Sequence, residues 1–195
     1  MPSTTIGPAP EQRRVYGTWF EGLLVRALAK RLTPELISDL RTAGIDLSRP
    51  LEQHYAAAVR LETIRLLRKH LFTDQSDEYA CHALGRAAVE GFLQTLAGQA
   101  LVLVLRLLGP RALMKRAGAL MSTASNYISA DAIERAPFHW EVRLEGADLP
   151  PAYWAGMLMA GLEVCSARNA HVAPVSHIGE QVVLSCRWDP PETRQ

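Results

Sequence analysis

The chain has 195 residues, of which 48% are hydrophobic and 21% charged, and its formal net charge is +1. This balance is typical of a globular domain with one sizeable core, and it excludes the disordered and fibrous classes. The near-neutral charge gives no reason to expect nucleic acid as a partner. Three cysteines without a Cys-x-x-Cys pair predict reduced thiols in a cytoplasmic protein, with neither a disulfide framework nor a zinc cluster.

The sequence predicts a flexible leader over residues 1–14, one domain over residues 15–189 and a short tail over residues 190–195. The start of the leader lacks the basic and apolar regions of a secretory signal. The most apolar run, Ala100–Leu108, contains Arg106 and is far shorter than the about 20 residues that cross a bilayer. We therefore expect no transmembrane segment and interpret this run as a buried helix.

Helical periodicity dominates the first two thirds of the chain, from about residue 16 to residue 122. Prolines, glycines and capping side chains divide this part into separate helices. The predicted helices are, in chain order, residues 20–32, 34–44, 54–71, 78–96, 100–108 and 110–122.

The hydrophobic period shortens toward two residues in the last third of the chain, about residues 126–188. Trp140, Val142 and Leu144 alternate with charged residues, as in a strand with one buried face. Two further runs joined by a short turn are typical of a hairpin. The predicted strands are Tyr127–Ala132, Trp140–Glu145, Ala170–His177 and Gln181–Trp188.

A helix is expected between the second and third strands, over Pro151–Ala167. Trp154, Leu158, Leu162 and Cys165 share one face of it, which we expect to pack against the sheet. The predicted fold class is therefore α+β, an N-terminal multi-helix layer followed by a β-β-α-β-β antiparallel sheet unit.

The helix predicted over residues 78–96 carries an unusual stripe of small side chains. Each glycine inside a helix costs about 1 kcal/mol relative to alanine, so a compensating contact is expected. Small residues let another backbone approach closely, and we expect the run 100–108 to be the partner. The alternative is a groove for a flat or long apolar ligand. The stripe consists of Leu84, Ala88, Gly91, Thr95 and Gly98.

The polar residues form no recognisable catalytic or metal-binding pattern. The histidines are scattered, and the sequence contains no nucleophile elbow, P-loop or dinucleotide fingerprint. Cys81 and His82 are adjacent, and neighbouring helical side chains diverge by about 100°. Cys165 and Cys186 fall on apolar faces, where a buried, unreactive thiol is expected. We therefore expect no catalytic residue and no metal site.

A run of basic residues without an acid follows the most apolar segment: Arg106, Arg111, Lys115 and Arg116. A solvated helix face is the simpler interpretation. An anionic partner or a membrane surface is the alternative.

Several segments together carry a family resemblance: VYGTWFEGLL, LRTAGIDLSRPL, HALGRAAVEGFLQTLAGQA, LGPRALMKRA, SNY and PAYWAGMLMAGLE. Over about residues 15–188, the chain resembles the uncharacterised paralogous family expanded in Myxococcus and its relatives. This resemblance implies no particular activity.

The β-β-α-β-β unit also resembles the small-molecule-binding domains of the four-vinyl-reductase type, the haem–nitric-oxide-binding domains and the Bet3-like subunits of vesicle-tethering complexes. This likeness is one of topology and does not by itself imply a function. The haem-binding group carries a Tyr-x-Ser-x-Arg signature, whereas the nearest string here, Tyr127-Ile128-Ser129-Ala130-Asp131, lacks the arginine. The fold admits haem, but the sequence gives it no support, and no cofactor is expected.

These observations favour a non-enzymatic binding or signalling domain with a hydrophobic small molecule between its helices and its sheet. The alternative is a protein–protein interaction module, a homodimer or an adapter, without a small-molecule ligand. The candidate pocket residues, each otherwise an ordinary core residue, are Phe92, Trp140, Trp154, Met157 and Met159.

Overall fold

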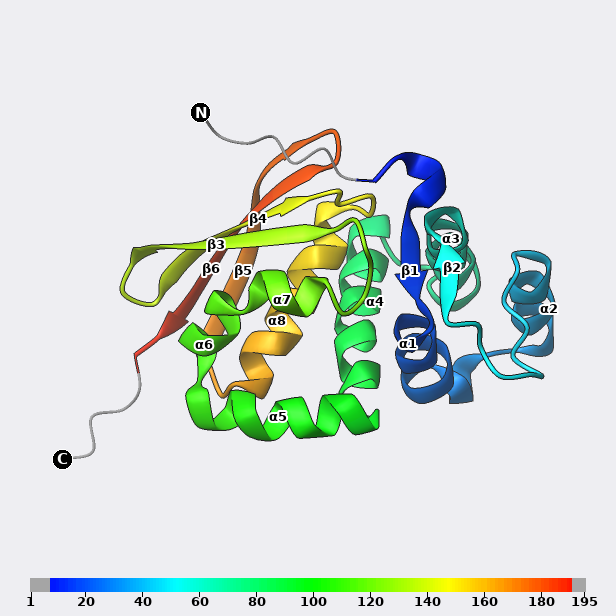
Figure 1. The fold of residues 1–195 in the computed structure, drawn as a ribbon, viewed down its shortest axis with the longest axis horizontal. Helices are drawn as coiled ribbons and strands as arrows, with labels where there is room; N and C mark the ends of the chain where they lie inside the picture. The colour runs from blue at the N-terminus through cyan, green and yellow to red at the C-terminus, as the bar shows by residue number, and fades with distance from the viewer. Residues whose placement is uncertain (1–7, 191–195) are drawn as a thin grey trace.

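The computed structural model describes residues 8–190. Residues 1–7 of the expected leader and 191–195 of the expected tail lie outside the described residues. Residues 10–14 of the expected flexible leader include a 3-10 turn, η1 (Pro10–Gln12), which leads into a strand, β1 (Arg14–Tyr16). This strand pairs antiparallel with β2 (His54–Ala56), far away in the sequence (Figure 1).

The first helices deviate from the sequence prediction at their boundaries. The expected helix over residues 20–32 is a short α-helix that continues as a π-helix and ends in a 3-10 turn. The expected helix over residues 54–71 begins only at Ala57, because residues 54–56 form β2. Thr33 caps the helix that begins at Pro34, since its hydroxyl accepts from the backbone N–H of Leu36. These elements are α1 (Gly17–Phe20), η2 (Glu21–Ala27), η3 (Ala29–Arg31), α2 (Pro34–Thr42) and α3 (Ala57–Leu71).

The middle of the chain forms four more helices: α4 (Asp77–Phe92), α5 (Leu96–Leu108), α6 (Pro110–Lys115) and α7 (Ala117–Met121). The side chain of Thr95 starts α5 as an N-cap, because its hydroxyl accepts from the N–H of Gly98 at 3.1 Å. The chain bends by 98° between α4 and α5. Within the described part, no single helix is long and apolar enough to cross a bilayer, although this bent pair passes that test together.

A four-stranded antiparallel sheet fills the C-terminal part, in the order β3-β4-β6-β5. Trp140 and Val142 of β4 lie opposite Cys186 and Leu184 of β6, and all four are buried, as the alternating pattern predicted. The α+β fold class and the β-β-α-β-β order are thus confirmed. The strands are β3 (Ser129–Ala136), β4 (His139–Glu145), β5 (Arg168–Ile178) and β6 (Gln181–Asp189).

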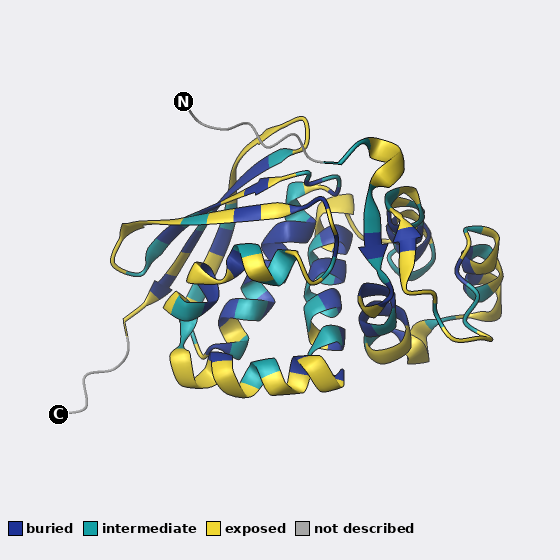
Figure 2. Ribbon diagram, viewed as in Figure 1, coloured by how far each residue is buried: buried dark blue, intermediate teal, exposed yellow. Residues whose placement is uncertain are grey.

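The helix α8 (Pro151–Val164) joins the sheet to the helical part. It packs on β5 and β6 on one side and on α4 on the other, so the layers run from the sheet through α8 and α4 to η2 (Figure 1). Trp154, Leu158, Leu162 and Cys165 are all buried, as expected. Figure 2 shows the contrast between α4 and α8, whose residues are mostly buried or intermediate, and the mostly exposed α5.

The glycines of α4 allow close packing, but the prediction that the run 100–108 is their partner is wrong. Gly85 lies against the carbonyl of Tyr153 in α8, and Gly91 lies against the carbonyl of Gly22 in η2. A methyl group at either position would overlap the facing backbone. Helix α5 turns away from α4 instead of packing along it, because the chain bends at Thr95. Leu84, Ala88 and Gly98 of the predicted stripe are also buried.

Candidate functional site

The helices surround a partly open apolar cavity of about 130 Å³, here called the α4–α8 cavity. Its wall consists mainly of side chains from six helices: α1, α4, α5, α6, α7 and α8. The cavity therefore depends on the packing of these helices against one another. The residues that line it are Thr18, Trp19, Ala88, Val89, Phe92, Leu93, Leu101, Leu105, Leu113, Ala117, Leu120, Met121, Thr123, Ala124, Met157, Leu158, Gly161 and Val164.

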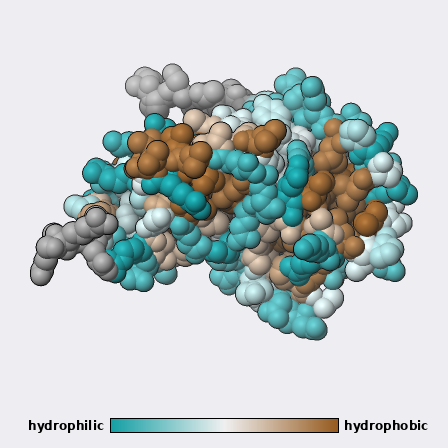
Figure 3. Space-filling view, turned by 90° about the horizontal axis from the view of Figure 1, so that it is seen from below, coloured by the Kyte–Doolittle hydropathy of each residue, from teal (hydrophilic) through white to brown (hydrophobic). Residues whose placement is uncertain are grey.

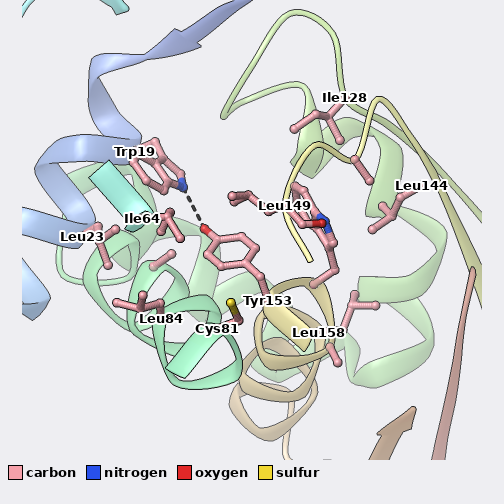
Figure 4. Packing of buried hydrophobic residues seen from close by; sticks show 14 of the residues in the cluster. Trp19, Leu23, Ile64, Cys81, Leu84, Ile128, Leu144, Leu149, Tyr153 and Leu158 are labelled. Carbon is pink, nitrogen blue, oxygen red and sulfur yellow. Dashed lines mark hydrogen bonds between the residues drawn. The ribbon is translucent and has the colours of Figure 1, made fainter. Parts of the chain in front are cut away.

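The lining carries no charged side chain, and its polar groups are the hydroxyls of Thr18 and Thr123 and the indole N–H of Trp19. That N–H is already used, since Nε1 of Trp19 donates to the hydroxyl of Tyr153 at 3.0 Å (Figure 4). Burial raises the pKa of Tyr153 to about 12, so this hydroxyl keeps its proton. The cavity therefore offers a ligand dispersion contacts and few hydrogen bonds.

An open groove borders this cavity at its two threonines. Thr18 and Thr123 line both spaces, and the groove also contains Glu21, Arg49 and His54. The polar edge of the cavity thus faces a groove with charged walls, whereas its remaining wall is apolar.

Phe92 and Met157, two of the five predicted pocket residues, line the cavity. Trp140, Trp154 and Met159 do not. Trp140 is buried on the sheet. Trp154 donates its Nε1–H to the carbonyl of Leu149 at 2.9 Å, which holds the ring away from the cavity.

Helix α5 supplies Leu101 and Leu105 to the cavity, a contribution that the sequence alone did not predict. Their spacing of four residues places both on one side of a helix, and this pattern lay within the run that was expected to be buried. The run is only partly buried, because its other side faces away from the protein.

A buried polar cluster joins the helical part to the sheet unit, and sequence patterns gave no sign of it. Arg60 of α3, which is 1% exposed, forms an ion pair with Asp148 in the loop before α8. The other carboxylate oxygen of Asp148 accepts from the hydroxyl of Tyr127 at 2.6 Å. The guanidinium of Arg60 also lies 5.4 Å from the ring centre of Tyr127 and 5.7 Å from that of Trp154. Burial raises the pKa of Tyr127, so its hydroxyl acts as a donor.

The cysteines and histidines do not come together into a reactive site. Burial raises the pKa of Cys165 to about 11 and that of Cys186 to about 12, and it also raises the pKa of Cys81. Burial, followed by the positive charge of Arg86, lowers the pKa of His82. Among the described residues, no cysteine is hydrogen-bonded to a histidine, and no group of three or more His, Cys, Asp or Glu side chains could hold a metal ion.

The family described as "Protein of unknown function (DUF2378)" has a sequence model that matches residues 13–189. The chain belongs to this family. The matched range contains helices α1 to α8, the four-stranded sheet and every residue that lines the cavity. No curated protein matches the sequence.

Solved structures of H-NOX proteins share the fold of this family member. An H-NOX protein from S. oneidensis, a triple mutant in the Fe(II) ligation state, matches with a TM-score of 0.69, at 12% identity over 91% of this chain and 97% of that one. The Fe(II) unliganded H-NOX protein from K. algicida gives a TM-score of 0.64, at 12% identity over 92% of this chain and 100% of that one. An oxygen-binding H-NOX domain related to soluble guanylate cyclases gives a TM-score of 0.57, at 14% identity over 92% of this chain and 96% of that one. At these identities the likeness shows a shared fold.

The residues of the α4–α8 cavity do not fit haem. Its lining contains no histidine, cysteine or tyrosine to bind the iron, only the thioethers of Met121 and Met157. It also contains no arginine or lysine to meet the propionates. The volume of about 130 Å³ lies well below the about 300–1,000 Å³ of common cofactor sites. The string nearest to the haem-binding signature, Tyr127 to Asp131, ends in an aspartate and supplies no cation.

Proposed function

We propose that this domain binds a small hydrophobic molecule other than haem in the α4–α8 cavity. The observation that carries the proposal is a partly open apolar cavity without charged side chains, lined by six helices. Close-packed interiors leave few voids larger than a water molecule, so an apolar space of this size is an exception to ordinary packing. Apolar cavities stay dry and take up apolar molecules.

The size of the cavity limits the ligand. A volume of about 130 Å³ approaches that of an engineered apolar cavity of about 150 Å³ in another protein, which binds benzene. The space therefore suits one aromatic ring or a short alkyl chain. A ligand with a polar end would place it toward Thr18 and Thr123, because these hydroxyls mark the edge that borders the charged groove.

The fold supports this proposal without defining the ligand. H-NOX proteins, among them one studied for haem distortion and one that binds oxygen, share this arrangement of helices and sheet. Here the same arrangement surrounds an apolar lining without an iron ligand of the histidine, cysteine or tyrosine type. We therefore assign the domain to ligand binding and sensing rather than to haem chemistry.

Native mass spectrometry and organic extraction of the purified protein test this proposal. We expect a stoichiometric apolar molecule, or, if the protein is purified empty, a higher unfolding temperature in buffer saturated with benzene. Leu101→Trp should fill the cavity and abolish both signals. Leu96→Trp is the matched control, because the same change lies on the same helix at an exposed position. An empty protein whose unfolding temperature benzene leaves unchanged would refute the proposal.

A further inference from the structure

Helix α5 is apolar on the side that faces away from the protein as well as on the side that faces the cavity. Leu96 is 87% exposed, Leu103 is 67% exposed and Leu107 is 86% exposed, whereas Leu105 on the opposite side is buried. A helix that is hydrophobic all round is normally covered on every side. Within the described part of the chain, nothing covers this outer face.

The outer face is too broad for a coiled-coil seam. At 100° per residue, the exposed large apolar side chains from Leu103 round to Leu108 span an arc of about 140°. A coiled-coil seam uses only two of every seven positions and is much narrower. Helix α5 has 13 residues, which corresponds to a length of about 20 Å. A single helix face of this length provides little of the about 800 Å² per partner that a stable dimer buries.

The surrounding charges favour an anionic surface over a second copy of the chain. The sequence contains no acidic residue between Glu90 and Asp131. Arg106, Lys115 and Arg116 in this segment are exposed. Arg111 forms an ion pair with Glu134 at 2.7 Å and so is already neutralised. A twofold contact through this segment would bring positive charges together without an acid from the same segment to pair with them.

We propose that the outer face of α5 binds the surface of an anionic lipid bilayer, with the helix axis parallel to the membrane plane. Viewed from the side on which α5 lies, the molecule shows hydrophobic areas with hydrophilic side chains between and around them (Figure 3). Interfacial helices bury their apolar face at the level of the acyl chains, while basic side chains reach the head groups. In this proposal Arg106 on α5, together with the exposed Lys115 and Arg116 in the segment that follows α5, takes this role.

The geometry fits binding at the surface rather than insertion across the bilayer. Helix α4, which precedes α5, is held between α8 and η2 by backbone contacts at Gly85 and Gly91, and it cannot straighten into a span without loss of the core. The length of about 20 Å for α5 is shorter than the about 30 Å of the hydrocarbon core. This surface proposal does not depend on a ligand in the α4–α8 cavity, because it rests on the opposite side of α5.

Co-sedimentation with vesicles tests the proposal. We expect the full chain to bind vesicles of phosphatidylcholine and phosphatidylglycerol but not vesicles of phosphatidylcholine alone, and to bind less in high salt. The double variant Leu103→Glu/Leu107→Glu should weaken binding at least about tenfold. Ile178→Glu is the matched control, since Ile178 is 74% exposed on the sheet unit, and its binding should equal that of the unmodified chain.

A fluorescence measurement reports the position of α5 directly. The emission of a polarity-sensitive dye attached through Leu107→Cys should shift to shorter wavelength on anionic vesicles. The emission of the same dye attached through Ile178→Cys should not shift. The three native cysteines are buried and do not compete for the label. Failure of the unmodified chain to bind anionic vesicles would overturn the proposal. So would binding that Leu103→Glu/Leu107→Glu leaves unchanged, or a dimer that this variant dissociates without any vesicle binding.

Discussion

The indole N–H of Trp19 donates to the hydroxyl of Tyr153 across 134 residues of sequence, at 3.0 Å inside the core (Figure 4). The bond ties α1 to α8 at the edge of the α4–α8 cavity. Both residues are buried, so neither partner can find water if the other is lost.

Tyr153→Phe should therefore destabilise the protein by about 1–3 kcal/mol, because it leaves the Trp19 N–H buried without an acceptor. Urea unfolding measures the change. Tyr79→Phe serves as the control, since Tyr79 is 57% exposed and its loss of a hydroxyl should not move the midpoint. Equal midpoints for the two variants would contradict the importance of this bond.

Stability should fall at alkaline pH. Burial raises the pKa of Cys165 to about 11 and that of Cys186 to about 12, from 9.0, and that of Tyr153 to about 12, from 10.0. A pKa that is higher in the folded state contributes stability that is complete below the unfolded value and is lost as the pH rises through the folded value. The unfolding free energy should thus decline from about pH 9 to about pH 12. Cys186→Ala should make this decline shallower, and an unaltered slope would show that Cys186 is not protected by burial.

Gly91→Ala should destabilise the fold, although alanine favours a helix by about 1 kcal/mol over glycine. A methyl group at this position overlaps the carbonyl oxygen of Gly22 in η2. Gly91→Leu should be worse still. Gly161→Ala is the comparison, because its nearest neighbour is the end of the flexible Leu113 side chain at 3.1 Å. Thermal unfolding of the three variants checks the order, and a stabilised Gly91→Ala protein would mean that α4 and η2 do not touch there.

Asp148→Leu should cost about 3–5 kcal/mol, because it leaves the buried guanidinium of Arg60 without its counter-ion. The double variant Arg60→Met/Asp148→Leu should recover much of that loss, since it removes both buried charges. A double-mutant cycle by urea unfolding gives the coupling. Additive losses would show that the two residues act independently. Glu62→Gln breaks an exposed ion pair with Arg65 and should leave the midpoint unchanged.

The sequence by itself determined the order of elements in the sheet unit. Alternation around Trp140–Glu145 and the helical face that contains Leu158 and Leu162 are local patterns, set by which side of one strand or helix is buried. Such patterns can be recognised without knowledge of the rest of the chain. They placed β3, β4, α8, β5 and β6 in the correct order, and the short turn between β5 and β6 gave their pairing.

Only the tertiary structure decided what each face touches. The pairing of Arg14 with Ala56, the contact of Gly91 with Gly22 and the bond from Trp19 to Tyr153 each join segments distant in the sequence. Hydrophobic periodicity marks a face as apolar but does not say whether a helix, a cavity or solvent lies opposite. For this reason the run 100–108 could be predicted as a helix, yet its division into a cavity wall and an exposed surface depended on the 98° bend after α4.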